Sequence, residues 1–355
     1  MTKQLLIALL FSISLYAETI IYTKNNIHAF LPKNGEISFK LAYQAMNDTL
    51  DIFNVKESEF SGNSQNIDSL GAMQGFDIGI GYSFYDDFYL NANINQQHLQ
   101  YSSSTLVNTN VDLYIRYNIY SSTDLAFAID GGYVLNHAKD LYIKDINTIN
   151  SNIKKIAPDK DIKISADGTT LNYTGSNGTL TIPLTLEPYA SIEDTKDDAF
   201  YFRLLSSYKT KSFLFDVFAG YKQINIQYTV DTSLTYEPEL EEEFKNNSPR
   251  ISNKRVDATL FMGASLRYQI DSLYTTFGYR YNNILRIDGL EEIQENHIID
   301  LDFLYSITPN IGAYLGFHAM SNQFNGEINY LYTQYSKTSF DHPYGYISIG
   351  TVLKF

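Results

Sequence analysis

Apolar and polar residues alternate with a period of two through most of the chain. Such alternation predicts β-strands whose two faces meet different surroundings, because successive side chains of a strand point to opposite sides. We count about twelve such segments of roughly ten residues, the length that a tilted strand needs to cross a membrane. They lie near residues 35–46, 73–85, 87–100, 107–120, 124–136, 199–210, 213–228, 255–270, 273–284, 296–307, 311–321 and 344–355.

The lengths of the connections favour a membrane barrel over a soluble sandwich, which can show the same alternation. Short connections near 85–87, 121–123, 210–212, 271–272 and 308–310 alternate with longer ones near 47–72, 137–198, 229–254 and 322–343. This arrangement is typical of barrels with short periplasmic turns and long outer loops. The sequence therefore predicts an all-β fold, a closed up-and-down antiparallel transmembrane β-barrel of about twelve strands, with fourteen or ten as alternatives. An even strand count places the short turns and both termini in the periplasm and the long loops outside the cell.

Residues 137–198 form an insertion too long for a featureless loop. Two hairpin signals, Asp167-Gly168 and Asn177-Gly178, lie within it between alternating apolar residues. They predict a small β-ribbon in this long extracellular loop, either outside the membrane or folded into the mouth of the barrel. Pro183 argues against a further wall strand there, since proline cannot donate to a sheet ladder.

The first residues have the pattern of a secretory signal peptide. Lys3 precedes an apolar run from Leu5 to Leu15, and Ala17 offers a small residue for cleavage. The run is too short for a membrane-spanning helix, which needs roughly 20 residues. We therefore predict a signal peptide over residues 1–17, an N-terminal periplasmic or lumenal segment over 18–34, and the barrel over 35–355.

The last strand carries hydrophobic side chains at every second position and ends on an aromatic residue. Ile347, Ile349, Leu353 and Phe355 share one face of it. This pattern resembles the terminal strand of Gram-negative outer-membrane β-barrels, a porin-like class, and it identifies no specific family. The resemblance implies a bacterial outer-membrane location, lipids and lipopolysaccharide as surroundings, and these residues as the signal read by the barrel-assembly machinery. In a closed barrel such a strand pairs with the first one.

Composition agrees with a barrel and excludes some functions. The 30 Tyr and 22 Phe residues accompany no Trp and no Cys, so disulfides and thiolate sites are impossible. A formal charge of −14 argues against nucleic acid as a partner. Aromatic residues gather near the short turns and predict a girdle at one membrane interface. Its members are Phe84, Phe88, Tyr117, Tyr120, Tyr208, Phe213, Tyr268, Tyr274, Tyr305 and Phe355.

If the apolar face points to lipid, charged residues of both signs face the lumen. The candidates for lining it and setting its selectivity are Asp112, Arg116, Arg203, Asp257, Arg267, Arg280, Asp300 and Asp302. We expect Arg267 and Arg280 to form ion pairs with the two acids at 300 and 302, because charges in a confined space persist when paired. The favoured function is a narrow channel for passive transport of small solutes or ions. The alternative is a structural or surface-adhesion barrel whose lumen is occluded, for instance by the long loop 137–198.

One segment suggests a membrane-embedded lipid hydrolase. His318, Ser321 and Asn322 are similar to the His-x-Ser-Asn strand of outer-membrane phospholipases and lipid A deacylases. The spacing departs from that pattern, because residues three apart on a strand lie on opposite faces. The histidines also show no convergence of the kind that a metal site needs. We therefore predict no enzymatic activity, no cofactor and no metal.

Overall fold

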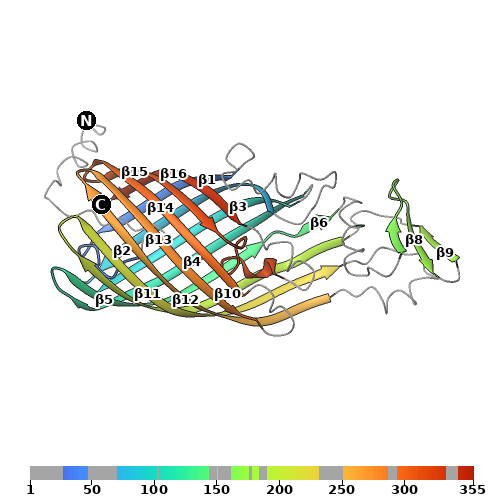
Figure 1. Cartoon of the computed structure of the whole chain (residues 1–355), viewed down its shortest axis with the longest axis horizontal. Helices are drawn as coiled ribbons and strands as arrows, with labels where there is room; N and C mark the ends of the chain where they lie inside the picture. The colour runs from blue at the N-terminus through green and yellow to red at the C-terminus, as the bar shows by residue number, and fades with distance from the viewer. Residues whose placement is uncertain are drawn as a thin grey trace, which may run out of the picture.

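Twelve antiparallel strands close into a tilted barrel in the computed structural model (Figure 1). The structure describes residues 27–46, 70–101, 104–143, 150, 161–175, 178–183, 190–231, 251–286, 294–332 and 343–355. The ring strands are β1 (Ile37–Met46), β2 (Leu70–Phe84), β3 (Phe88–Tyr101), β4 (Ser104–Ser121), β5 (Leu125–Ala138), β10 (Ala190–Lys209), β11 (Phe213–Asp231), β12 (Ile251–Ile270), β13 (Leu273–Leu285), β14 (Glu295–Thr308), β15 (Ile311–Met320) and β16 (Tyr344–Lys354). The predicted fold class and strand number are confirmed, and the predicted signal peptide lies outside the described residues.

The barrel closes between its first and last strands, as predicted. β16 runs antiparallel to β1, with Leu41 opposite Thr351. Ile37 and Phe355 exchange both backbone hydrogen bonds, at 3.0 and 2.9 Å. Lys354 Nζ lies 2.9 Å from Glu36 Oε2 inside the seam. Closure removes the two free edges that an open sheet would expose.

An apolar band surrounds the barrel near its short turns. On β11 the outward residues from Phe213 to Tyr221 are large, apolar and exposed, apart from Ala219. Further along the same strand the outward residues Gln223 and Asn225 are polar. The inner face of β11 shows the reverse order. Its inward residue near the turn end, Asp216, is charged, whereas Ile224, further toward the loop end, is apolar, and both are buried. An exposed apolar band on a closed barrel fits hydrocarbon, so the outward change from apolar to polar marks where the wall leaves the membrane.

Aromatic residues ring the turn end of the barrel, as predicted for a girdle. Phe88 lies 4.9 Å from Tyr117 between ring centroids, and Phe213 lies 4.8 Å from Tyr268. The prediction for Tyr274 was wrong. Its side chain packs with the inward cluster of Ala42, Leu304, Tyr314 and Val352. Side chains of β13 alternate between its two faces. Phe277 points outward, so Tyr274, three residues earlier, points inward.

Several strands continue beyond the apolar band at the loop end. β10 begins at Ala190 rather than near residue 199, and its extension pairs with β11 and with the short strand β6 (Leu141–Ile143). The predicted ribbon is a separate three-stranded sheet of β7 (Asp161–Ile164), β8 (Thr170–Gly175) and β9 (Gly178–Pro183). Figure 1 shows it standing beyond the loop end, outside the barrel mouth. No helix among the described residues is both long enough and apolar enough to cross a membrane.

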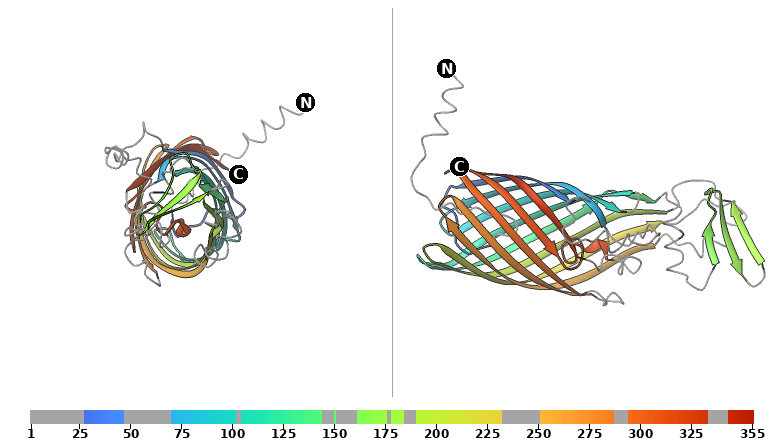
Figure 2. Two further views of the ribbon diagram at one scale, coloured as in Figure 1. Left: turned by 90° about the vertical axis from the view of Figure 1, so that its right-hand side faces the viewer. Right: turned by 45° about the horizontal axis from the view of Figure 1, so that its top comes forward.

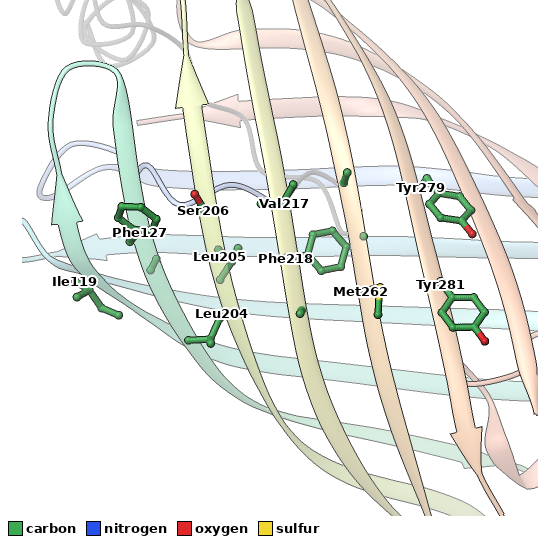
Figure 3. A pocket seen from close by; sticks show the side chains of 14 residues that line it. Ile119, Phe127, Leu204, Leu205, Ser206, Val217, Phe218, Met262, Tyr279 and Tyr281 are labelled. Atoms are coloured by element: carbon green, nitrogen blue, oxygen red, sulfur yellow. The ribbon is translucent and has the colours of Figure 1, made fainter.

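The outer surface carries an apolar groove of about 830 Å³ across β5 and β10–β13 (Figure 3). Phe127, Leu204, Met262 and Tyr279 border it with exposed side chains. Small residues such as Ala219 form part of its lining. The groove belongs to the exposed apolar band of the wall. The polar side chains that could bind or react with a molecule lie inside the barrel.

Candidate functional site in the lumen

The predicted lumen residues all occupy inward positions. Arg116, Arg203, Asp257, Arg267, Asp300 and Asp302 are buried, while Asp112 and Arg280 are partly buried. Because alternate residues of each strand face inward, the ring brings these side chains from eight strand positions into one narrow interior. Their role in selectivity stays a prediction.

A buried triad braces the wall where β4, β5 and β10 meet. Arg116 donates from Nε and Nη2 to the carboxylate of Asp130, at 2.7 and 2.9 Å. Arg203 donates to the same carboxylate, with its Nε 2.9 Å from Oδ2. These residues are direct neighbours across the ladders, because Asp130 pairs with Arg116 on one side and with Arg203 on the other. A carboxylate with two guanidinium partners satisfies the requirement that buried charges be paired.

Residues 27–34, the turn-end segment, run inside the barrel at the end of the short turns. The carbonyl oxygen of His28 accepts a hydrogen bond from Arg116, and that of Ala29 accepts one from Asn118 Nδ2 at 3.0 Å. Ala29 N donates to Ser207 Oγ at 2.6 Å. Apolar packing accompanies these bonds, with Phe30 in a buried cluster lined by β5, β10 and β11. Residues 27–34 therefore contact inward side chains of β4, β5, β10 and β11, and the place of the whole segment 18–34 stays a prediction.

Residues 321–332, the loop-end segment, fold into the other end of the lumen. This segment contains the 3₁₀ turn η2 (Asn329–Leu331), which lies within the ring when the barrel is viewed from its loop end (Figure 2, left). Phe324 packs against Tyr344, with ring centroids 5.2 Å apart, and is fully buried. Ile328 and Tyr330 join the same apolar cluster, which includes inward residues of most ring strands. Burial of these side chains holds the segment in place.

Hydrogen bonds from the wall fix the backbone of the loop-end segment. Asp197 accepts from the backbone N–H groups of Asn329 and Tyr330, at 2.7 and 3.1 Å. Tyr330 Oη donates to Asn108 Oδ1 at 2.8 Å, and Arg255 Nη2 donates to the carbonyl of Asn329 at 3.1 Å. These contacts come from β4, β10 and β12. On the opposite side of the ring, the backbone N–H of Leu70 on β2 donates to Gln323 Oε1 at 2.9 Å, so the segment spans the lumen.

Glu327 of the loop-end segment lies among basic groups. Its carboxylate forms an ion pair with Arg280, and its Oε2 lies 3.6 Å from His318 Nε2. The other ring nitrogen of His318 lies 2.5 Å from Asp300 Oδ1. Lys222 Nζ donates to the carbonyl of Gly326 at 2.5 Å.

The ion pairs that we expected between Arg280 and the acids of β14 were wrong. Register explains why. Arg280 lies opposite Ile298, one inward step nearer the loop end than Asp300, and it therefore reaches Glu327. Asp300 lies opposite His318 on β15 and bonds to it. The carboxylate of Asp302 accepts from Tyr314 Oη at 2.7 Å.

An enclosed polar cavity of about 30 Å³ lies within the lumen. Lys40, Asn93, Asp112 and Arg203 line it, and Ile27 of the turn-end segment borders it. This volume suits a water molecule rather than a solute. In this structure, residues 27–34 and 321–332 occupy the lumen at its two ends.

Sequence reasoning missed the loop-end segment as an occluding element. The expectation named the long loop 137–198, whose described sheet instead lies outside the barrel (Figure 1). A signal was present in the inward positions near the loop end, which become apolar at Met46, Leu99, Ile224 and Ile226. Apolar residues facing a lumen need an apolar partner, and the segment with Phe324 and Tyr330 provides it.

The residues similar to a lipid hydrolase motif do not come together. Ser321 Oγ donates to Asn296 Oδ1 at 3.1 Å and accepts from the backbone N–H of His297 at 3.0 Å. His318 points into the lumen and bonds to Asp300. A nucleophile and its base need hydrogen-bond contact, which these partners do not give. Within the described ranges, no group of three or more histidines and carboxylates is arranged to hold a metal ion.

No family model and no curated protein sequence matches the chain. The solved structures that resemble the chain are β-barrels of outer-membrane proteins, and the likeness is confined to the arrangement of strands. Among solved structures, the NanC porin is 10% identical, with 90% of this chain and 100% of that chain covered at a TM-score of 0.42. The translocator domain of the autotransporter NalP from Neisseria meningitidis is 8% identical, with 90% and 88% covered and a TM-score of 0.44. Likenesses this remote carry no conclusion about the function of this chain.

Proposed function

We propose that the protein is a narrow channel for passive transport of small solutes or ions across the outer membrane, closed in this structure by two segments that lie inside its lumen. The observation that carries the proposal is how the loop-end segment is held. It forms no ladder of the sheet, and beyond one backbone hydrogen bond from Ser321 to His297 on β14 it is held mainly by side chains of the wall, so it can leave without breaking the ring. Its departure would expose the inward polar side chains Lys222, Arg255 and Arg280 to water and so open a hydrated path.

Orientation and surroundings belong to the same proposal. Short turns and termini would face the periplasm, and the sheet of β7–β9 would face the exterior. The apolar band would contact lipid and lipopolysaccharide, and Phe355 with its alternate neighbours would present the assembly signal. The separation of Ser321 from the ring of His318 supports a protein without lipid hydrolase activity.

Conductance in planar bilayers tests the channel. The purified full chain is compared with a linker variant in which residues 27–34 and residues 323–331 are both replaced by Gly-Ser linkers, because one of these segments lies at each end of the lumen. We expect rare or no current steps for the parent and frequent steps for the variant. Thr181→Ala in the exposed sheet outside the barrel serves as the control and should behave as the parent. Silent bilayers with a correctly folded linker variant would reject the channel.

A structural or adhesive barrel is the second candidate. The observation in its favour is the tight filling at both ends, which leaves an enclosed cavity of about 30 Å³. Under this function the linker variant would lose stability and would still conduct nothing. Cell adhesion or envelope integrity would instead depend on the outer loops.

A further inference from the structure

We propose that Arg280, Lys222 and His318 form a binding site for carboxylate-bearing solutes, and that Glu327 occupies it as an internal stand-in. The inference deepens the proposed channel function by naming a solute class, and its relevance to transport rests on that function. Binding itself does not require conduction, so the two can fail separately.

The basic groups converge from separate strands on two consecutive residues of the loop-end segment. Arg280 on β13 pairs with the Glu327 carboxylate, and His318 on β15 approaches its other oxygen at 3.6 Å. Lys222 on β11 binds the adjacent carbonyl oxygen of Gly326 at 2.5 Å. The wall therefore presents donors to a negatively charged group and to a neighbouring polar oxygen, a combination found in many small organic acids.

The wall carboxylates near this arrangement each have a hydrogen-bond partner of their own. Asp112, which faces Lys222, accepts from Tyr201 Oη at 3.1 Å. Asp300 is bonded to His318 on the side of the ring away from Glu327. Asp197 is engaged by the backbone N–H groups of the loop-end segment. Arg280 has its ion pair with Glu327, and its side chain is only 22% exposed. When Glu327 withdraws, a largely buried guanidinium loses its counter-charge, a costly state that a solute carboxylate would relieve.

The geometry favours a carboxylate over a neutral solute. A guanidinium offers a planar fork of N–H donors that matches the two oxygens of a carboxylate. His318 is held in orientation by Asp300 and by contact with Tyr346, whose ring centroid lies 4.8 Å away. An amide or hydroxyl in the same place would leave the positive charge of Arg280 without compensation.

Because the Glu327 carboxylate occupies the site, we expect it to compete with dissolved carboxylates for Arg280 and His318. Glu327 is tethered beside the site, so a dissolved carboxylate must displace it, and apparent affinity falls with the fraction of time the site is free. Neutralising Glu327 should therefore raise affinity. If the site is free about a tenth of the time in the parent, Glu327→Gln should bind about tenfold more tightly.

Calorimetric titration of the full chain in detergent micelles tests the site, with glutarate as the carboxylate probe and glutaramide as its neutral match. We expect Glu327→Gln to bind glutarate about tenfold more tightly than the parent. Adding Arg280→Gln should abolish the gain, and adding Arg280→Lys should retain part of it. Glu295→Gln, an exposed acid at the same end of the barrel, should leave affinity unchanged. Far-UV circular dichroism checks that each variant is folded.

Equal glutarate affinity in the parent and Glu327→Gln would overturn the proposal, as would binding that survives Arg280→Gln or glutaramide binding of equal strength. Absence of glutarate binding to every folded variant would overturn it as well. Current steps from the linker variant in the bilayer assay would in that case leave the channel function standing without this solute class. Glutarate binding without any conductance would reject transport and keep the site.

Discussion

The buried triad of Arg116, Asp130 and Arg203 permits a quantitative prediction. The carboxylate of Asp130 is fully buried and receives two hydrogen bonds from each arginine. Asp130→Asn keeps the shape of the side chain and removes its negative charge. The amide NH₂ group then replaces one accepting oxygen and faces the N–H donors of an arginine, so hydrogen bonds are lost as well. Breaking a buried ion pair by neutralising one partner costs about 3–5 kcal/mol. Two arginines depend on this acid, so we expect the free energy of unfolding to fall by the upper part of that range.

Urea unfolding in lipid vesicles, followed by far-UV circular dichroism, measures the change, because the chain has no Trp to report by fluorescence. Asp124→Asn, at an exposed turn, is the matched control and should change the free energy of unfolding by less than about 0.5 kcal/mol. Replacing the whole triad by Met, Leu and Met should recover most of the loss, since no unpaired charge then remains. A loss below about 1 kcal/mol in Asp130→Asn would refute the assignment of a paired, desolvated triad.

Two further predictions concern the closing seam. Lys354→Glu places a second acid beside Glu36 and should lower the urea concentration at the midpoint of unfolding. The double variant Glu36→Lys with Lys354→Glu exchanges the two charges and should restore most of the lost midpoint. A double variant no more stable than Lys354→Glu alone would contradict the ion pair. A Cβ at Gly350 would lie 2.2 Å from the backbone oxygen of Leu41, so Gly350→Val should sharply reduce the yield of folded barrel in membranes. Gly131→Val, where nothing lies within 4 Å, is the control, and similar yields of the two variants would show that the seam tolerates the side chain.

The strand pattern predicted the twelve ring strands and their closure because it depends on local chemistry. Outward residues such as Phe215 meet hydrocarbon and inward ones such as Asp216 meet the polar interior, so period two appears directly in the sequence. Tyr274 shows the limit within that rule. An aromatic residue near a turn was assigned to the girdle by position, while its parity placed it inside.

Partners inside the lumen could not be predicted in the same way. Parity tells which face a side chain occupies, but the height at which inward residues of different strands meet depends on the stagger of the hydrogen-bond ladders. The strand pattern alone therefore predicts Arg280 beside Asp300, whereas the ladder places Ile298 opposite Arg280. The partner it finds, Glu327, lies on a connection without period-two alternation.

The sequence by itself determined the class of fold, the inward and outward faces of the wall, and the seam between β1 and β16, since each follows from side-chain alternation between two solvents. Only the tertiary structure decided that residues 27–34 and 321–332 enter the lumen, and that Glu327 meets Arg280 there. The physical reason is that these segments are placed by packing and ion pairs contributed by many distant strands. Such contacts exist only once the ring has closed.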